Sequence, residues 1–268
     1  MATVIEINAP ADPRIADYLD LTDAELRRAG RYFIAESIEV VRRLLAGRHP
    51  LRSVLITPAR LPNLVDDLAR LDLPVFVVEQ DVMNEVVGFK LHRGVVATAE
   101  RLPEPGLQEL IQDAGTVAIL EGLNDQENLG AIFRSAHALG IDAVLLDPTC
   151  ADPYYRRTVR VSMGAVLEIP FKRLSGWPED LGTIRRAGFD LVALTPGSEA
   201  VSIEDIEVQG HRIALLLGAE GPGLRPETLA LADQLVRIPM AEEFDSLNVG
   251  HAAAIAFHRL AQANRPKG

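Results

Sequence analysis

Apolar residues recur along the chain with the spacings of short buried strands and of helices, and a proline-rich break separates two regions of this pattern. Before the break, short apolar runs predict strands at residues 54–56, 75–78 and 95–99. Apolar residues from Ile34 to Leu45 recur at helical spacing and predict a helix. These elements indicate a small α/β unit of about 100 residues.

The break is the segment 101–106, in which two prolines and a glycine interrupt periodic structure and predict a linker. After it, strands are predicted at residues 117–120, 143–146, 167–171, 190–194, 213–217 and 235–238. Helices are predicted at residues 128–139, 156–161 and 179–187, after Pro226, and at residues 248–262. Apolar strands that alternate with helices indicate a mostly parallel sheet with helices on both faces. We therefore expect an α/β protein with two domains, residues 1–105 and residues 106–268.

The composition agrees with a globular protein, since 48% of the 268 residues are hydrophobic and 24% are charged. No apolar run approaches the roughly 18 residues of a membrane span, and the N-terminal sequence lacks a signal-peptide pattern. The one cysteine, Cys150, excludes an internal disulfide framework and a multi-cysteine zinc site. The six histidines show no metal-binding spacing. We expect a cytoplasmic protein that has no membrane partner and no metal.

Basic residues are concentrated in two places of a chain whose formal net charge is −11. Residues 27–60 hold eight arginines against Glu36 and Glu39, and residues 156–173 hold five basic residues against Glu168. An arginine-rich helix face exposed to solvent would by itself explain the excess of basic residues in either of these two regions, which we call the basic islands. The acidic total argues against a general nucleic-acid coat, whereas two basic islands in an acidic chain favour a local contact with a polyanion.

A polar segment at residues 124–134 joins a predicted strand to a predicted helix. Asn128 suits the N-cap of that helix, because its side-chain oxygen can accept a free backbone N–H. Gly130 in the first turn costs up to about 1 kcal/mol relative to alanine, which suggests that another group approaches closely there. Arg134 near a helix start opposes the helix dipole, so we expect it to have a ligand or an acidic partner. A plain cap and a surface ion pair are the alternatives without a functional role.

A second segment follows the predicted strand at residues 213–217, where the three glycines Gly218, Gly221 and Gly223 lie within six residues. Glycines at a strand end permit a positive φ and allow a ligand to touch the backbone. The carboxyl end of a strand is also where open α/β sheets bind ligands. The segment matches neither a P-loop nor the G-x-G-x-x-G fingerprint, and a plain tight turn is the alternative.

A third segment runs from Arg237 into the last predicted helix, which begins near Ser246 or Asn248, both suitable caps. The small residues at 252–254 allow another element to pack very closely. A capped helix in a tight interface would explain this helix. It would not explain why all three segments combine Asn or Gly with isolated charges at the ends of strands.

Taken in order, the three segments resemble the three motifs of the SpoU (TrmH-type) RNA ribose 2′-O-methyltransferases of the SPOUT superfamily. The matching residues are 128–134, 217–223, and 238–240 with 246–249, and the resemblance covers residues 116–262. The N-terminal part, including residues 34–38 and 93–97, is more weakly similar to the L30e-like substrate-binding domain often fused to this family. The chain departs from the usual motifs at three places. Family members usually have Asp-Pro before the asparagine of the first motif, where this chain has Gln126 and Glu127. In the third motif, Glu242 or Glu243 replaces a common glycine, and Gly250 stands where serine is frequent.

The resemblance implies a SPOUT fold, in which the C-terminal part of the parallel sheet is threaded into a deep trefoil knot, beside an N-terminal L30e-like domain. It implies S-adenosyl-L-methionine as the cofactor, rRNA or tRNA as the partner, and a homodimer formed through the knot and the last helix. The catalytic positions carried over by the motifs are Asn128, Arg134, Glu220, Ser246 and Asn248. The cofactor-binding positions are Leu194, Thr195, Leu217, Gly218, Ala219, Ile238, Met240 and Leu247. The arginines expected to bind RNA are Arg27, Arg28, Arg31, Arg156 and Arg157.

The implied reaction transfers a methyl group from the sulfonium to a ribose 2′-oxygen, and it depends mainly on positioning because the donor is already activated. A guanidinium does not readily lose a proton, so we expect Arg134 to bind the adjacent phosphate and stabilise the developing alkoxide. Asn128 and Glu220 would order this arginine and the glycine segment, with Ser246 and Asn248 near the reacting oxygen. A SPOUT base methyltransferase and a non-catalytic RNA- or cofactor-binding module are the alternatives, and the sequence does not distinguish rRNA from tRNA.

Overall fold

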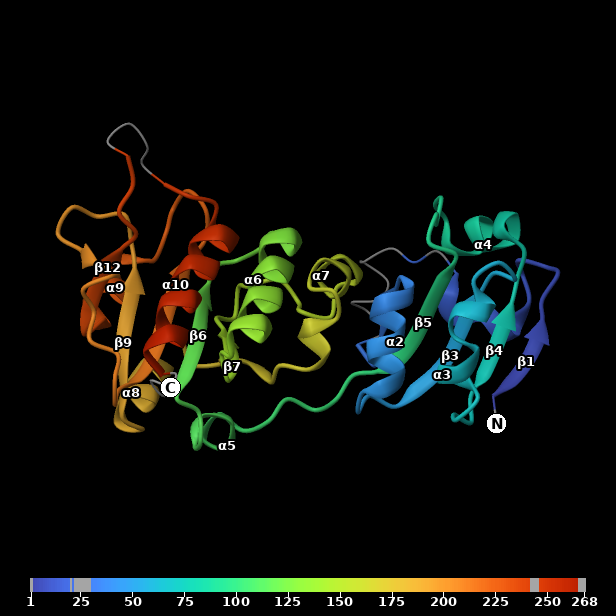
Figure 1. The fold of residues 1–268 in the computed structure, drawn as a ribbon, viewed down its shortest axis with the longest axis horizontal. Coiled ribbons are helices and arrows are strands. Elements are labelled where there is room, and N and C mark those ends of the chain that lie inside the picture. The colour runs from blue at the N-terminus through green and yellow to red at the C-terminus, as the bar shows by residue number, and fades with distance from the viewer. Residues whose placement is uncertain (1, 20, 22–29, 242–245, 265–268) are drawn as a thin grey trace. The chain divides into compact units, whose positions relative to one another are not determined.

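The computed structural model describes residues 2–19, 21, 30–241 and 246–264, and the contacts in it divide the chain into two compact units. The first unit comprises Met1–Pro103 and Pro153–Leu167, and the second comprises Glu104–Asp152 and Glu168–Gly268 (Figure 1). The sequence predicted one boundary, after residue 105, inside a segment that has no regular secondary structure. The observed boundary lies two residues earlier, and the segment Pro153–Leu167 belongs to the first unit although the prediction placed it in the second domain.

The first unit is built on a mixed sheet whose strands, within the described residues, follow the order β1-β4-β3-β5-β2. They are β1 (Thr3–Glu6), β2 (Tyr32–Glu36), β3 (Leu51–Ile56), β4 (Pro74–Val77) and β5 (Val95–Glu100). β1 and β3 run parallel to β4, whereas β5 runs antiparallel to β3 and β2. The helices of this unit include α2 (Ile38–Ala46), α3 (Val65–Leu68) and α4 (Gln80–Val87). The three strands predicted before the break coincide with β3, β4 and β5 to within a few residues.

The helix predicted from Ile34 is wrong in its first part, because Tyr32–Glu36 forms the strand β2. Ile34 is fully buried and lies opposite Thr98 of β5. The chain then turns at Ser37, whose φ of 86° is in the left-handed region, and α2 begins at Ile38. An apolar residue that faces the core from a strand can coincide with helical spacing, and a short run does not distinguish the two.

The contacts of Pro153–Leu167 with β2 explain its place in the first unit. The helix α7 (Arg156–Val161) of this segment packs against that strand. The rings of Tyr154 and Phe33 stack with their centroids 4.9 Å apart, and both side chains are buried. Local periodicity does not reveal such a contact, because the two partners are far apart in the sequence.

A buried carboxylate strengthens the same junction. Glu36, whose side chain is 3% exposed, pairs with Arg156 at 2.6 Å and with Arg160 at 3.1 Å. A carboxylate removed from water to this extent requires charged partners, since its lost hydration is otherwise uncompensated.

The second unit contains a sheet in which, among the described residues, every strand pair is parallel, in the order β10-β12-β9-β11-β6-β7-β8. The strands are β6 (Thr116–Glu121), β7 (Ala143–Leu146), β8 (Phe171–Arg173), β9 (Phe189–Leu194), β10 (Val201–Ser202), β11 (Arg212–Gly218) and β12 (Gln234–Arg237). The predicted α/β architecture with a mostly parallel sheet is confirmed. The strand predicted at residues 167–171 is wrong, because the apolar run Ala165–Leu167 is buried in a 3-10 helix and β8 begins only at Phe171.

The helices of the second unit are α5 (Leu107–Ile111), α6 (Gln126–Leu139), α8 (Asp180–Arg186), α9 (Pro226–Leu231) and α10 (Val249–Asn264). One hydrophobic cluster joins Ile119 and Leu216 of the sheet to Ile184 of α8 and Ile111 of α5. Neighbouring strand residues point to the opposite face of the sheet, where α6 and α10 lie side by side (Figure 1). None of the helices within the described ranges combines the length and the apolarity that a membrane span requires.

Removing Arg156 is expected to destabilise the first unit more than removing Arg160. The side chain of Arg156 is 22% exposed and that of Arg160 is 36% exposed, so the pair formed by Arg156 is the better shielded from water. We expect Arg156→Ala to lower the free energy of unfolding by about 2 kcal/mol and Arg160→Ala by about 1 kcal/mol. Hydrogen exchange of the β2 amides in denaturant measures both losses.

The control for this comparison is Arg42→Ala, which removes exposed ion pairs with Glu39 and Asp67. Exposed pairs of this kind contribute less than about 1 kcal/mol. Equal losses for Arg156→Ala and Arg42→Ala would contradict the structural role of the buried pair.

Candidate functional site

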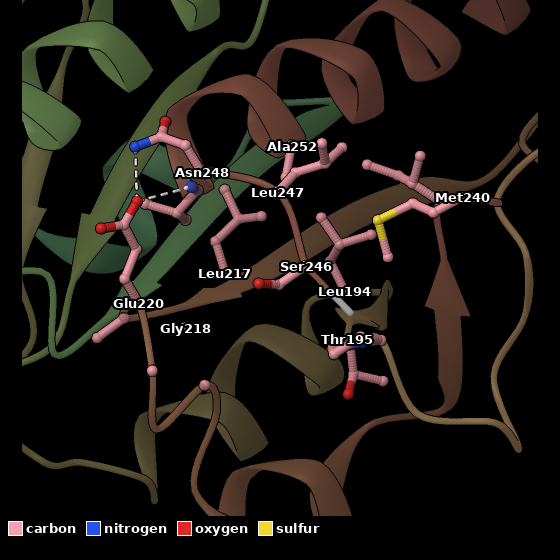
Figure 2. A pocket seen from close by; sticks show the side chains of 16 residues that line it. Leu194, Thr195, Leu217, Gly218, Glu220, Met240, Ser246, Leu247, Asn248 and Ala252 are labelled. Carbon is pink, nitrogen blue, oxygen red and sulfur yellow. Dashed lines mark hydrogen bonds between the residues drawn. The ribbon is translucent and has the colours of Figure 1, made fainter. Parts of the chain in front are cut away.

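The carboxyl ends of three strands deliver loops to one cavity of about 470 Å³ (Figure 2). The parallel register of β12, β9 and β11 brings these ends to the same edge of the sheet. Every residue predicted to bind a cofactor lines this cavity: Leu194, Thr195, Leu217, Gly218, Ala219, Ile238, Met240 and Leu247. The fold thus assembles one wall from three separate stretches of the chain.

The glycine loop, residues 218–223, closes tightly on itself at the end of β11. The N–H of Gly223 donates to the carbonyl oxygen of Ala219 at 3.0 Å, and Gly221 and Gly223 have φ values of 86° and 70°. A Cβ at Gly218 would lie 2.2 Å from the carbonyl carbon of Gly223 and 2.3 Å from the nitrogen of Leu224. Position 218 therefore has no space for a side chain, and the glycine there is required by the path of the chain itself.

A chain of hydrogen bonds joins three of the predicted catalytic residues beside the cavity. Nδ2 of Asn248 donates to Oδ1 of Asn128 at 2.7 Å, and it also donates to Oε1 of Glu220 at 2.5 Å (Figure 2). Glu220 accepts a further hydrogen bond from the backbone N–H of Val249 at 3.3 Å. Oδ1 of Asn248 accepts the backbone N–H of Gly250 at 2.9 Å. Since both ends of the Asn248 amide are bonded, its orientation is fixed and it holds the Glu220 carboxylate in place.

The predicted N-cap role of Asn128 is wrong. α6 begins at Gln126, and the carboxylate of Asp125 caps it by accepting the backbone N–H of Asn128 at 2.8 Å. A carboxylate at the N-terminus of a helix is also favoured by the helix dipole. Asn128 lies in the first turn, so its side chain is available to bond Asn248.

The other two predicted catalytic residues lie in different places. Ser246 lines the cavity shortly before α10. Arg134 is exposed on α6, and within the part of the chain that the structure describes its guanidinium neither lines this cavity nor forms an ion pair. Its six-residue separation from Asn128 corresponds to about 9 Å along the helix axis and about 240° of rotation. The acidic partner considered for Arg134 is thus absent from the described residues.

Small residues bring α10 close to α6. A Cβ at Gly250 would lie 3.1 Å from the Cβ of Ala131 and 3.2 Å from Oδ1 of Asn248. Ala253 of α10 is fully buried. The close packing predicted for the small residues of the last helix is therefore found within one chain, and it keeps Asn248 within hydrogen-bonding distance of Asn128.

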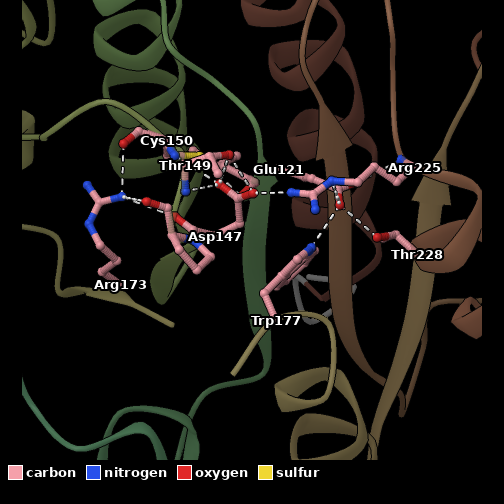
Figure 3. A network of polar contacts seen from close by, with 10 residues as sticks. Glu121, Asp147, Thr149, Cys150, Arg173, Trp177, Arg225 and Thr228 are labelled. Carbon is pink, nitrogen blue, oxygen red and sulfur yellow. Dashed lines mark hydrogen bonds and ion pairs between the residues drawn. The ribbon is translucent and has the colours of Figure 1, made fainter. Parts of the chain in front are cut away.

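Two buried carboxylates beside the glycine loop were not predicted from the sequence (Figure 3). Glu121 and Asp147, at the ends of the neighbouring strands β6 and β7, are 2% and 0% exposed. Burial by itself would raise the pKa of Asp147, but hydrogen bonds from Thr149, Gly122 and Cys150 outweigh burial and hold this pKa below its usual value. The signal that would have identified the pair is an acidic residue directly after an apolar strand, repeated on the adjacent strand.

The arginines predicted to contact RNA have different environments. Arg27 and Arg28 lie outside the described residues, and Arg31 and Arg157 are exposed. Arg156 is held by the buried carboxylate of Glu36. The side chain of Arg156 remains 22% exposed beside this ion pair, and its contact with RNA stays a prediction.

The chain matches the model of the SpoU rRNA Methylase family over residues 115–258. It is 46% identical to an uncharacterized tRNA/rRNA methyltransferase of Mycobacterium tuberculosis, over 99% of this chain and 94% of that protein. It is 35% identical to the 23S rRNA (guanosine-2′-O-)-methyltransferase RlmB of Xanthomonas campestris, over 76% of this chain and 86% of that protein. The crystal structure of an AdoMet-bound rRNA methyltransferase from Sinorhizobium meliloti superposes with a TM-score of 0.84 at 28% identity, over 98% of this chain and 99% of that one.

The matched residues 115–258 make up more than half of the chain and include all three motif segments. They also include every residue that lines the cavity. These similarities show that the chain belongs to the SpoU rRNA methylase family, as its motifs predicted.

Proposed function

We propose that the protein transfers a methyl group from S-adenosylmethionine to the ribose 2′-hydroxyl of an rRNA or a tRNA. The methyltransferase class follows from the family and from the relatives that span nearly the whole chain. The ribose position is supported by the RlmB relative, whose name specifies a guanosine 2′-oxygen of 23S rRNA. The observation in this structure that carries the proposal is the cavity beside which Asn128, Asn248 and Glu220 are bonded together.

The cavity fits the proposed cofactor in size and in lining. Its volume of about 470 Å³ is in the range of small-molecule sites, roughly 300–1,000 Å³. Apolar side chains such as Leu194, Leu217 and Met240 would hold the flat adenine, and backbone groups of the glycine loop would bind its polar edge. When bound, S-adenosylmethionine supplies a methyl group that is already activated by its sulfonium.

The hydrogen-bonded residues would order the reacting end of the cavity. Asn248 donates to both Asn128 and Glu220, so the three side chains are held in one hydrogen-bonded unit. Ser246 lines the cavity close to this unit in sequence and would lie near the ribose. These residues act by fixing the position of the 2′-oxygen, which is the main requirement when the donor is activated.

Arg134 would supply the positive charge that the reaction needs. Its guanidinium is exposed and forms no ion pair within the described residues, so it can bind an external phosphate. An arginine binds phosphate through two parallel N–H donors, and the same cation would stabilise negative charge that develops on the 2′-oxygen. A guanidinium does not readily deprotonate, so this role differs from that of a general base.

The finer structural features that the family resemblance implies belong to the same proposal. The chain of the second unit forms a trefoil knot at the cavity, which is supported by the place of β12 between β9 and β10. The protein acts as a homodimer in the cytoplasm; the apolar Leu247 and Ile255, 41% and 43% exposed near and on α10, support a contact there. The first unit is an L30e-like domain that binds RNA, with Arg31 and Arg157 as exposed contacts.

Incubation of the protein with tritiated S-adenosylmethionine and either rRNA or tRNA tests the proposed reaction. A 2′-O-methyl group blocks alkaline cleavage of the adjacent phosphodiester, because the 2′-oxygen is the internal nucleophile. The label should therefore appear in an alkali-resistant dinucleotide. Label in the base of a mononucleotide would indicate a base methyltransferase, and cofactor binding without labelled RNA would indicate a non-catalytic module; either result contradicts the proposal.

Arg134→Ala is expected to lower kcat by about a hundredfold or more, because the developing charge loses its cationic partner. Among the described residues Arg134 does not line the cavity, so the affinity for S-adenosylhomocysteine should stay within about twofold. Arg134→Lys keeps the charge without the paired donors and should recover part of the rate. A near wild-type rate of methyl transfer in Arg134→Ala, with RNA affinity unchanged, would refute this role.

Gly218→Ala is expected to abolish measurable cofactor binding. A methyl group at this position would collide with the backbone of Gly223 and Leu224, so the glycine loop must open or shift. Gly182→Ala in α8 is the matched control, because a Cβ there meets only the far end of Arg186 at 3.9 Å. Calorimetric titration with S-adenosylhomocysteine measures both variants, and wild-type affinity in Gly218→Ala would contradict the placement of the cofactor.

A further inference from the structure

Glu121 collects hydrogen bonds from Trp177, which precedes α8, and from Arg225 and Thr228 at the start of α9 (Figure 3). Its Oε1 accepts from Nε1 of Trp177 at 2.8 Å and from the hydroxyl of Thr228 at 2.8 Å. The backbone N–H of Arg225 donates to Oε2 at 2.9 Å, and Nε of Arg225 lies 3.0 Å from Oε1. The buried carboxylate is thus fully engaged, and two of its contacts come from Arg225.

The guanidinium of Arg225 connects this carboxylate to a second one. Its Nη2 donates to Oδ2 of Asp147 at 2.8 Å (Figure 3). Asp147 follows β7, the neighbour of β6 in the sheet, and its Oδ1 accepts the backbone N–H groups of Thr149 and Cys150. One arginine therefore bridges two buried carboxylates that the sheet itself holds side by side.

The position of Arg225 in the chain links this bridge to the cavity. Gly218, at the start of the glycine loop, pairs with Glu121 in the parallel register of β11 and β6. Arg225, two residues beyond the end of the loop, is bonded to the carboxylate of the same Glu121. Both ends of the loop are thus anchored on one residue, and the loop between them carries Glu220 and lines the cavity.

Glu121 also caps α9, which begins directly after Arg225. The helix has no cap from its own N-cap side chain. Instead, Glu121 accepts the N–H of the N-cap residue Arg225 and the hydroxyl of Thr228 in the first turn. A carboxylate at this end is favoured by the free N–H groups and by the helix dipole. The start of α9 and the end of the loop are therefore fixed by the same group.

We infer that Arg225, clamped by Glu121 and Asp147, is a positioning residue that sets the conformation of the glycine loop and through it the affinity for the cofactor. This inference rests on the proposed function for the identity of the ligand. Arg225 is not among the cavity-lining residues that the structure describes, so it acts through the loop. Its side chain is 49% exposed while its two partners are 2% and 0% exposed, so a substitution at Arg225 places no new side chain in the core, whereas a substitution of either carboxylate would.

The test compares three full-length variants. Arg225→Ala removes the bridge, and Arg225→Lys keeps a positive charge that can reach only one carboxylate. Trp177→Phe is the matched control, because it removes one hydrogen bond from the same Glu121 carboxylate without touching the loop. For each, the measurements are hydrogen–deuterium exchange of the amides at 218–225 without ligand, the Kd for S-adenosylhomocysteine, and the melting temperature.

We expect Arg225→Ala to raise the Kd for S-adenosylhomocysteine at least about tenfold and to accelerate exchange of the loop amides. Arg225→Lys should give intermediate values, and Trp177→Phe should lower the melting temperature while the Kd stays within about twofold. Equal changes of Kd in Trp177→Phe and Arg225→Ala would reduce Arg225 to a general stabilising contact and overturn the inference. If Arg225→Ala does not fold, Arg225→Lys decides: wild-type loop exchange and wild-type Kd in that variant would also overturn it.

The same measurements separate this inference from the proposed function. Wild-type protein that does not bind S-adenosylhomocysteine would contradict the proposed function, whereas loop exchange without ligand still reports on the clamp. Wild-type binding with unchanged loop exchange in both arginine variants would contradict the clamp alone.

Discussion

The close approach of Gly218 to the backbone of Gly223 and Leu224 is the constraint on which the site depends. The chain leaves β11, forms the glycine loop and returns across the end of the same strand, so that a side chain at position 218 has no space. Because the loop is so compact, backbone atoms form part of the cavity wall, and a ligand can approach the main chain directly. Glu220 extends from the same loop to Asn248, so the closure of the loop also determines where this carboxylate lies.

The parallel register of the sheet extends this constraint to the rest of the site. The strands β9, β11 and β12 end at one edge, where open α/β sheets generally bind their ligands. α10 packs against α6 at small residues and brings Asn248 to Asn128. The glycine loop is consequently bonded through Glu220 to Asn248 before α10, and Arg225 just beyond the loop is bonded to Glu121 of β6 and to Asp147 after β7, two attachments that share no residue.

The second sheet and the wall of the cavity could be predicted from the sequence for a physical reason. Parallel strands covered on both faces are continuous apolar runs, and residues 143–146 coincide with β7 without error. The loops at their carboxyl ends must be glycine-rich or polar, so the motif segments indicated the residues that line the cavity. The strand β1, with mostly exposed residues, and β2, whose Ile34 fits a helical spacing, carry no such signal.

Most of the remaining contacts could not be predicted because they join residues that are distant in the sequence, whereas the cap of α6 was a local choice between Asp125 and Asn128. The amide of Asn128 has the chemistry of a cap, but Asp125 caps the helix and releases Asn128 for Asn248. Charge alone marked Arg156 as a candidate RNA contact, although the fold pairs it with the buried Glu36. The local sequence shows which hydrogen bonds or ion pairs a side chain is able to form. The fold decides which neighbouring residue it forms them with, and therefore what role it has.

A crystal structure of the protein with S-adenosylhomocysteine tests the central claim most directly, namely that the closed glycine loop forms the cofactor site. The account predicts the ligand inside the cavity of about 470 Å³, bonded to backbone groups of the glycine loop and packed against Leu217 and Met240, with the Glu220–Asn248 hydrogen bond retained. A ligand bound outside this cavity, or a glycine loop that opens to admit it with Gly218 no longer against Gly223, would contradict the account.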